Sequence, residues 1–443
     1  MNTLLIHIGS PKTGTTALQN FLYDNAKELE SYNWRYPDLK RELFELDSLR
    51  ISKQINGNVF LNKDDTVDVD SYYWNQIWGR VLQHLKEKNV IISSEILFWD
   101  SATNIFLEGA KKKYDNIKVV VYLRRQDKFV ESWWNQTIKQ GTSCETNFIE
   151  YAYSDKMQNF VFYGRKLDQI STIVGKENLI VRIYEKEQLK NAASIASDFL
   201  SLLGIDPDSM ELKKCKRHNP ALSPNYLEIK SQINSVVDCE NKLIRQYYRN
   251  SFLELSDKFV EKDEEKGFFT IEERKQFMKR FASENERIAR EYLQRENGVL
   301  FFDQNMDIPQ YKPHEFTSYD RDIIHVFTFL MEKVRKQNWT LAENLLLAQT
   351  RERKLAFFGA GNRADFFFDI SKLRPNIFID NNPDKRHKQM HGIEILSTED
   401  IEEWKDYFVV IICLQTEEIE EMLQSKGLQE GYDYVTSNKY FGW

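Results

Sequence analysis

Short apolar runs alternate with amphipathic stretches along the first 200 residues of the chain. The apolar runs predict buried strands, over residues 4–8, 90–94, 118–123 and 179–184. The stretches between them place apolar side chains at helical spacing, over residues 17–29, 71–88, 102–114, about 128–139 and 193–203. Strands separated by helices are typical of a parallel α/β sheet.

The second half of the chain has a different pattern. Long, highly charged helical patterns over 224–300 predict a helical lobe packed on the sheet. Residues 303–318 contain two prolines and no periodicity, which predicts a linker, and a helix follows over about 320–349. We therefore predict an α/β domain with its lobe over 1–304, a linker and helix over 305–351, and a second, small α/β domain over 352–443.

Composition and charge narrow the function classes. The 443 residues are 41% hydrophobic and 29% charged, with a net charge of −7, which disfavours a nucleic-acid partner. The four cysteines form no CxxC and no cluster with histidine, so no metal site is expected and free thiols in a reducing compartment are favoured. Neither a signal peptide nor a membrane span is indicated, which predicts a cytoplasmic protein. The oligomeric state stays open.

Four polar side chains follow predicted strands. They are Lys12, Glu95, Arg124 and Tyr184. Ligands of open α/β sheets bind outside the carboxyl ends of the strands. The sequence therefore predicts one active site that contains all four.

The loop from Ser10 to Thr16 joins the first strand to a helix N-terminus. Such a terminus has unpaired N–H groups and the positive end of the helix dipole, and so binds phosphate. Gly14 allows close approach of the backbone to the anion. Lys12 precedes Gly14, whereas a Walker A loop has its lysine after the last glycine.

The sequence SPKTGTTALQ, residues 10–19, resembles the 5′-phosphosulfate loop of sulfotransferases that use 3′-phosphoadenosine 5′-phosphosulfate (PAPS), especially the bacterial and glycan-type members. The resemblance implies that Lys12 acts at the leaving oxygen. It also implies that the 5′ phosphate is held by Lys12, Thr13, Gly14, Thr15 and Thr16. The alternative is a structural glycine turn with solvated threonines.

A second segment resembles the 3′-phosphate motif of the same family. There an arginine at the end of a strand is followed eight residues later by a serine in the next helix, as Arg124 is by Ser132 here. The fork of an arginine guanidinium suits phosphate. Arg125 is one residue out of this spacing. The alternative is that Arg124 or Arg125 caps a strand or pairs with Asp127.

Three further residues are assigned by the resemblance. Glu95 is similar to the glutamate base of heparan-type sulfotransferases, although a helix cap or an ion pair would also explain it. Tyr184 begins a Tyr-Glu-Lys segment that resembles the adenine-contacting Tyr-Glu-Asp of the family, with a core tyrosine as the alternative. Arg217 lies in the basic loop 213–220, which loosely resembles a loop that closes over the nucleotide and is otherwise a solvated charge run. His7, inside the first strand, is expected to be a core residue.

The C-terminal segment contains a different motif. An apolar strand runs into G-x-G-x-x-A at Gly359 and Gly361, and Asp380 ends a second strand. This is a Rossmann-type fingerprint. It resembles the small Rossmann-like units attached to bacterial polysaccharide-synthesis enzymes. An unidentified nucleotide at Gly359, Gly361 and Asp380 and a purely structural or interaction role are both left open.

Together these features predict a fold and a function. The fold is α/β, a P-loop-like parallel-sheet sulfotransferase domain with a helical lobe, plus a small C-terminal Rossmann-like α/β domain. The resemblance implies transfer of a sulfuryl group from PAPS to a hydroxyl, or as second choice an amine, of a glycan or glycolipid precursor. Lys12 and Glu95 would be catalytic, and PAP would be the product. The alternatives are a P-loop-like nucleotide kinase or hydrolase that needs Mg²⁺ and ATP, and a non-catalytic nucleotide-binding scaffold in polysaccharide biosynthesis.

Overall fold

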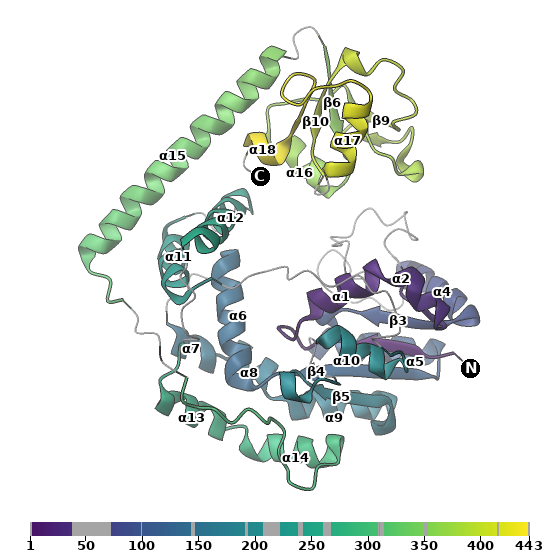
Figure 1. The fold of residues 1–443 in the computed structure, drawn as a ribbon, viewed down its shortest axis with the longest axis vertical. Coiled ribbons are helices and arrows are strands. Elements are labelled where there is room, and N and C mark those ends of the chain that lie inside the picture. Colours follow the sequence, from purple (N-terminus) through teal and green to yellow (C-terminus); the bar gives the residue numbers. More distant parts are fainter. Residues whose placement is uncertain are drawn as a thin grey trace. The chain divides into compact units, whose positions relative to one another are not determined.

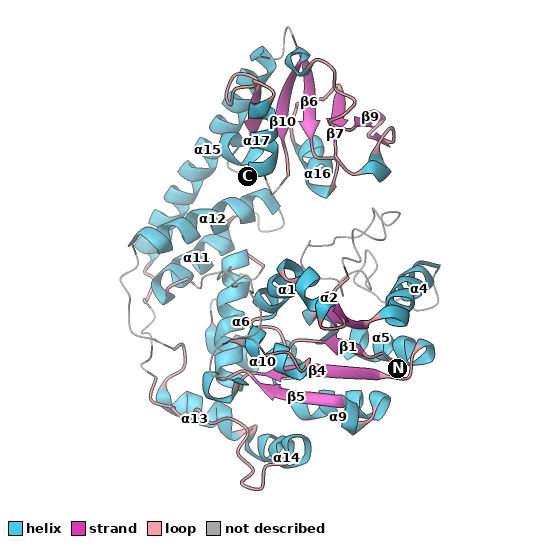
Figure 2. Ribbon diagram, turned by 45° about the vertical axis from the view of Figure 1, so that its right-hand side comes forward, coloured by secondary structure: helices cyan, strands magenta, loops and turns pink. Residues whose placement is uncertain are grey.

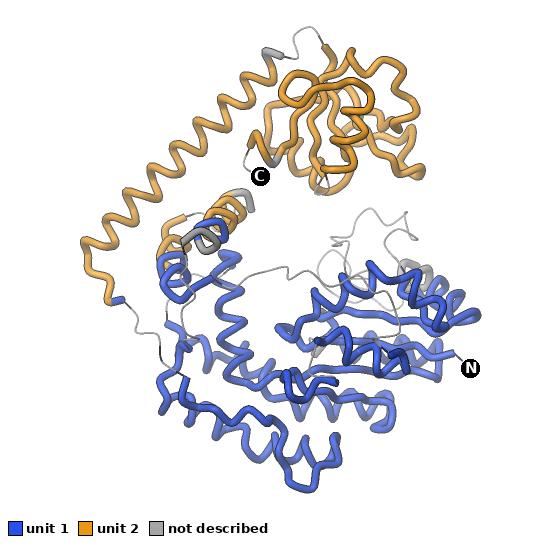
Figure 3. The backbone as a smooth tube through the Cα atoms, viewed as in Figure 1, with its two compact units in different colours: residues 1–231, 253–314 blue, residues 232–252, 315–443 orange. Residues whose placement is uncertain are grey.

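The protein forms two compact units. The computed structural model describes residues 2–37, 72–98, 100–142, 147–190, 194–206, 222–237, 242–259, 267–308, 310, 314–349, 353–413 and 416–441. Unit 1 comprises residues 1–231 and 253–314, and unit 2 comprises residues 232–252 and 315–443 (Figure 3). The predicted domain boundaries near residues 304 and 351 stay predictions.

Unit 1 contains a parallel five-stranded sheet in the order β2-β3-β1-β4-β5 (Figures 1 and 2). Its strands are β1 (Leu4–His7), β2 (Trp34–Arg35), β3 (Asn89–Ser93), β4 (Ile117–Leu123) and β5 (Leu179–Ile183). β1 lies in the middle, with Leu4 opposite both Val90 and Ile117. All four residues of β1 are buried, as expected for a parallel strand covered on both faces. The prediction of a parallel α/β sheet is confirmed.

Helices cover both faces of this sheet. On one face α1 and α10 pack over apolar side chains of β1, β3 and β4, such as Leu5, Ile91 and Val120. On the other, α9 packs on β4 and β5. The helices up to residue 202 are α1 (Thr15–Asp24), α2 (Ala26–Ser31), α4 (Tyr72–Glu87), α5 (Asp100–Lys113), α6 (Gln126–Gln140), α7 (Phe148–Tyr153), α8 (Asp155–Val161), α9 (Tyr163–Val174) and α10 (Ile195–Leu202).

The later helical segment is divided between the two units. Its helices are α11 (Pro224–Val236), α12 (Lys242–Phe259), α13 (Ile271–Lys279) and α14 (Ala282–Leu293). α13 packs on α6, and α14 packs on α9 and β5, so this part of the expected lobe does lie on the sheet. Residues 232–252, from α11 and α12, belong instead to unit 2.

Unit 2 contains a second sheet of six strands in the order β11-β10-β6-β7-β9-β8. The strands are β6 (Lys354–Phe358), β7 (Ile377–Ile379), β8 (Gln389–Met390), β9 (Ile393–Leu396), β10 (Tyr407–Ile411) and β11 (Tyr434–Thr436), and only β8 is antiparallel to its neighbour. The helices are α15 (Ser318–Gln349), α16 (Asn362–Ile370), α17 (Glu417–Ser425) and α18 (Ser437–Phe441). The small C-terminal α/β domain is therefore present, and its Rossmann-type nucleotide function stays a prediction.

One further finding concerns membranes. Among the helices in the described ranges, none combines the length and the apolar character needed to cross a bilayer.

Candidate functional site

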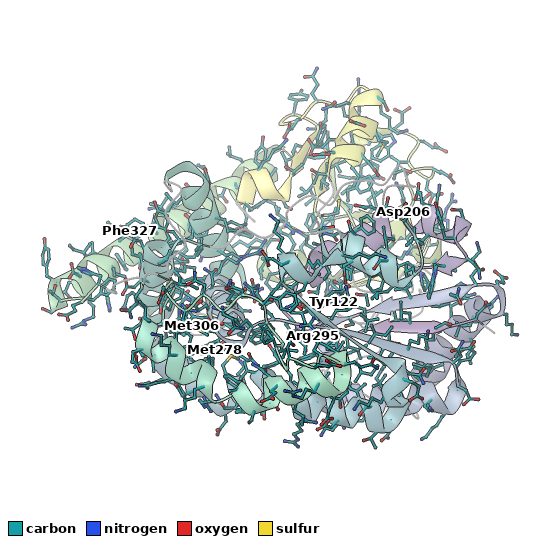
Figure 4. All side chains as sticks on the ribbon, turned by 60° about the horizontal axis from the view of Figure 1, so that its bottom comes forward. Tyr122, Asp206, Met278, Arg295, Met306 and Phe327 are labelled. Atoms are coloured by element: carbon teal, nitrogen blue, oxygen red, sulfur yellow. The ribbon has the colours of Figure 1, made fainter. Side chains whose placement is uncertain are left out.

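The loop after β1 is tied to β4 by buried hydrogen bonds. The Ser10 hydroxyl and the Ser10 N–H both donate to the carbonyl of Tyr122, at 2.9 Å each (Tyr122 is labelled in Figure 4). The Thr13 hydroxyl donates to the Ser10 carbonyl at 2.5 Å and is fully buried. Because that hydroxyl points into the fold, Thr13 can offer an anion only its main-chain N–H.

The loop ends at an uncapped helix N-terminus. Gly14 is the N-cap of α1, with φ of 78°, a left-handed conformation that favours glycine. No side chain caps α1, and its first turn has no acidic residue. The N–H groups of Thr15 and Thr16 therefore belong to the unpaired first turn of the helix, which attracts negative charge.

Tyr184, just after β5, covers Gly14. A Cβ atom added to Gly14 would lie 3.1 Å from the Tyr184 hydroxyl. The guanidinium carbon of Arg124 lies 6.0 Å from the centre of the same ring. The structure thus brings Gly14, Arg124 and Tyr184 together, as their places at the carboxyl ends of strands predict.

The charges of Arg124 and Glu95 act on Lys12 in opposite directions. Its carbonyl accepts a 2.7 Å hydrogen bond from Arg124 Nη1, and its Nζ donates to Gln136 Oε1 on α6 at 3.4 Å. Burial lowers the pKa of Lys12 to about 8, with Glu95 raising it and Arg124 lowering it further. The φ of Lys12 is 66°, in the left-handed region that costs a non-glycine residue conformational energy. Such strain is concentrated at functional sites.

Glu95 lies beside the loop on the other side. It opens a short 3₁₀ turn (Glu95–Phe98) that begins two residues after the end of β3, and its carboxylate accepts a hydrogen bond from the Thr15 hydroxyl. A Cβ atom added to Gly9 would lie 3.4 Å from the Glu95 Cα. Glu95 is therefore within contact of the loop predicted to hold the phosphate. Since a hydroxyl has one proton to donate, Thr15 can serve either Glu95 or an anion at one time.

The structure separates the roles of the two neighbouring arginines. Arg125 is 1% exposed and makes a bidentate pair with Asp127, at 2.8 and 2.7 Å. Arg124 faces Lys12, and its own carbonyl accepts a hydrogen bond from Tyr163. Burial lowers the pKa of Arg124. The alternative of pairing with Asp127 thus applies to Arg125, and Arg124 remains the candidate for phosphate binding, with Ser132 half-buried on α6.

A buried ionic network lies behind Arg125. Arg274, on α13, is 0% exposed and donates to Asp127 at 2.5 Å and to Glu131 at 2.8 Å. Burial favours the neutral form of Asp127, but the two guanidinium groups outweigh it and hold the pKa of Asp127 below its usual value. Nothing in the sequence distinguishes Arg274 from the other charged residues of this helix. The network fixes α13 against α6.

The remaining predicted residues differ in outcome. His7 is fully buried, its Nδ1 lies 2.8 Å from the Ser93 hydroxyl, and burial lowers its pKa to about 3, as expected for a core histidine. Arg217 and the basic loop 213–220 lie outside the described residues. Within the described ranges, no group of three His, Cys, Asp or Glu side chains is arranged to hold a metal ion.

A cavity of about 420 Å³ lies away from the loop. Arg125 borders it, together with residues of α13, α14 and the segment 298–306, among them Met278 and Met306 (Figure 4). None of the residues predicted to bind the sulfate donor lines this cavity.

In unit 2, Asp380 of the Rossmann-type fingerprint is hydrogen-bonded to the glycine loop of the same motif, at Ala360. Asp380 Oδ2 accepts from the Ala360 N–H at 2.9 Å and from Lys385 Nζ at 3.3 Å. Lys385 also donates to the Ala360 carbonyl at 2.9 Å. These bonds account for Asp380 structurally, so a nucleotide at Gly359, Gly361 and Asp380 has no further support here.

Comparison with known proteins gives little more. No family model matches the chain. An uncharacterized protein of Archaeoglobus fulgidus is 32% identical over 222 residues, which are 49% of this chain and 57% of that protein, so the match spans little more than half of that relative. A sulfotransferase from Alicyclobacillus acidocaldarius has a TM-score of 0.31 at 11% identity, covering 57% of this chain and 96% of its own. A sulfotransferase domain from the curacin biosynthetic pathway has a TM-score of 0.30 at 11% identity, with coverages of 52% and 82%. Likeness of this degree carries no argument about the present chain.

Proposed function

We propose that the protein is a PAPS-dependent sulfotransferase. The acceptor would be a hydroxyl, or as second choice an amine, of a glycan or glycolipid precursor in bacterial-type polysaccharide biosynthesis in the cytoplasm. The observation that carries the proposal is the convergence of two desolvated cations, Lys12 and Arg124, on an uncapped helix N-terminus beside Glu95. The sequence resemblance of the loop supplies the identity of the anion.

N–H groups and side chains of this chain would be sufficient to hold the anionic groups of the donor. The N–H groups at the start of α1 and the Lys12 ammonium would hold the 5′ phosphosulfate. Arg124 and Ser132 would hold the 3′ phosphate, with Tyr184 against the nucleoside. The proximity of Tyr184 to Gly14 and to Arg124 supports a position for the nucleoside between the two anion sites.

The residues then have separate tasks in the transfer. Glu95 takes the proton of the acceptor hydroxyl as the new O–S bond forms. The bond between sulfur and the bridging oxygen breaks, and Lys12 stabilises the negative charge that develops on that oxygen. Below pH 8 the Lys12 side chain is mainly the ammonium that this task needs. Transfer in line depends largely on positioning, which the rigid strand ends provide.

The test combines binding and turnover. Calorimetry should detect binding of PAP, and a mass-spectrometric screen of glycans with PAPS should find a product heavier by one sulfuryl group. Lys12→Ala should abolish that transfer, whereas Lys111→Ala, at an exposed position on α5, should leave it unchanged. Binding of ATP with Mg²⁺ but not of PAP would refute the proposal in favour of a kinase or hydrolase. PAP binding without transfer to any acceptor would favour the scaffold.

A further inference from the structure

Helix α15 has one face packed on its own unit. That face contains Trp339, whose ring centre lies 4.6 Å from that of Phe441 and 6.0 Å from that of Phe367. Ala342 and Leu346 belong to the core of the second sheet domain. Nearer the start of the helix, the Tyr248 hydroxyl donates to the carbonyl of the buried Thr328 at 3.4 Å. The contacts of this face explain why the helix is held in unit 2.

The opposite side of α15 is apolar and exposed. At 100° per residue, the large apolar residues that share this side lie within about 60° of Leu330. Tyr319, in the first turn and 72% exposed, also lies on this side. The others are Ile323, Val326, Phe327, Leu330, Val334, Leu341 and Leu345, and each has between 47% and 59% of its surface exposed. We call this second set the α15 stripe; Phe327 is labelled in Figure 4. Since the helix has 32 residues in one continuous run (Figure 1), it is roughly 48 Å long.

The α15 stripe has the repeat of a coiled coil. Phe327, Val334 and Leu341 follow one another every seven residues, and Ile323 and Leu330 form a second series offset by four. These are the a and d positions of a heptad. The second series continues with Gln337 and Asn344, which are polar. Polar residues at such positions fix register and partner number in coiled coils.

We infer that the α15 stripe is the dimer interface with a second copy of this chain. The stripe presents seven large apolar side chains, each about half exposed, along the helix. In a heptad arrangement these are the side chains that two paired helices bury against each other. A heptad stripe is complementary to itself, so two copies can pair about a two-fold axis.

The charges beside the stripe disfavour a lipid surface as the occupant. Helices that lie on membranes have a consistently basic polar face. Here Asp320 and Asp322 adjoin Arg321 at the start of the helix, and Lys333 and Lys336 follow. This mixture of signs suits a coiled-coil flank better. The inference does not depend on the proposed sulfotransferase activity.

The oligomeric state of the full chain tests the inference. Sedimentation over a concentration series should show a dimer for the native chain. The double variant Leu330→Glu, Leu341→Glu should weaken dimerisation at least about 100-fold, because each change buries an unpaired charge. Lys336→Glu, on the same helix but outside the stripe, should sediment as the native chain does. Circular dichroism should show that both variants are folded.

Several outcomes would overturn the inference. A native chain that is monomeric throughout the series would show that the α15 stripe is not a dimer interface. A dimer that the double variant leaves intact would place the interface elsewhere. Sedimentation of the native chain, but not of the double variant, with vesicles of anionic phospholipid would assign the stripe to a membrane surface instead.

Discussion

Replacing Lys12 with methionine removes a buried positive charge while keeping a side chain of similar length. The ordinary lysine pKa of 10.5 falls to about 8 in the folded chain, with burial as the main cause. Burial of the ammonium is therefore unfavourable to the folded state. Because methionine carries no charge, we expect Lys12→Met to raise the free energy of unfolding near neutral pH while it abolishes sulfuryl transfer.

The size of the gain follows from the two pKa values and changes with pH. At pH 7 the lysine is charged in both states, and the difference between 10.5 and about 8 corresponds to roughly 3 kcal/mol. Between pH 8 and 10.5 the unfolded chain binds more protons than the folded one, so the native protein regains stability as the pH rises. At pH 9.5 the advantage of Lys12→Met should fall to about 1.4 kcal/mol. The positive φ strains both side chains alike and cancels.

Urea denaturation followed by tryptophan fluorescence, at pH 7 and pH 9.5, measures this difference. Where the transitions of the two units are resolved, only that of unit 1, which contains Lys12, should move, and that of unit 2 serves as an internal reference. Lys111→Met, on the exposed side of α5, should change stability by less than about 0.5 kcal/mol. A variant no more stable than the native chain at pH 7, or equally stabilised at both pH values, would refute the reasoning.

Three other substitutions have definite expected outcomes. In Glu95→Gln, PAP should still bind, but turnover should fall at least about 100-fold because the base is lost. Because Glu95 raises the pKa of Lys12, the alkaline limb of the pH–rate profile should also move below its native position near pH 8. An unchanged rate would remove Glu95 from the mechanism. Gly14→Ala puts a Cβ atom 3.1 Å from the Tyr184 hydroxyl at a positive φ, which costs some 1–2 kcal/mol in the native loop conformation. The loop is therefore expected to relax in the free variant, and because PAP must restore its native conformation, calorimetry should show affinity reduced about tenfold or more; native affinity would contradict the placement of the nucleotide. Asp127→Asn removes the carboxylate that two buried guanidinium groups share, leaving Arg274 with Glu131 and Arg125 with Asp303. It should cost up to about 3–5 kcal/mol in urea denaturation, and a loss below 1 kcal/mol would show that the network contributes little.

The sequence was informative where local pattern and tertiary position coincide. Parallel strands covered on both faces are continuous apolar runs, so β1, β3, β4 and β5 could be recognised without any knowledge of the fold. Because the ends of these strands lie at one edge of the sheet, Lys12, Glu95, Arg124 and Tyr184 could be grouped in advance. Arg124 does contact Lys12 and lie near Tyr184, and Glu95 does lie within electrostatic range of Lys12.

Features that depend on long-range packing were not predictable in this way. β2 has only two residues, too few for a periodicity. In the sequence Arg274 does not differ from the other charged residues of its helix, and only the packing of α13 on α6 shows that it is buried. The direction of the Thr13 hydroxyl depends on the path of the loop over β4. The exposed side of α15 could be identified only once its other side was seen to be covered.

Lys12 and Arg124 lie close together in a desolvated site, and the coupling of their charges predicts that PAP binding changes the protonation of Lys12. Among the described residues, neither cation makes a salt bridge, and Arg124 lowers the pKa of Lys12. A bound dianion would favour the charged form and raise that pKa. At pH 8, where Lys12 is about half protonated, PAP binding should therefore take up roughly 0.5 proton. Calorimetry in buffers of different ionisation enthalpy measures this uptake, which should vanish in Lys12→Met. Binding of PAP without proton uptake at pH 8 would mean that the nucleotide does not contact Lys12, and the proposed stabilisation of the leaving oxygen would then have no physical basis.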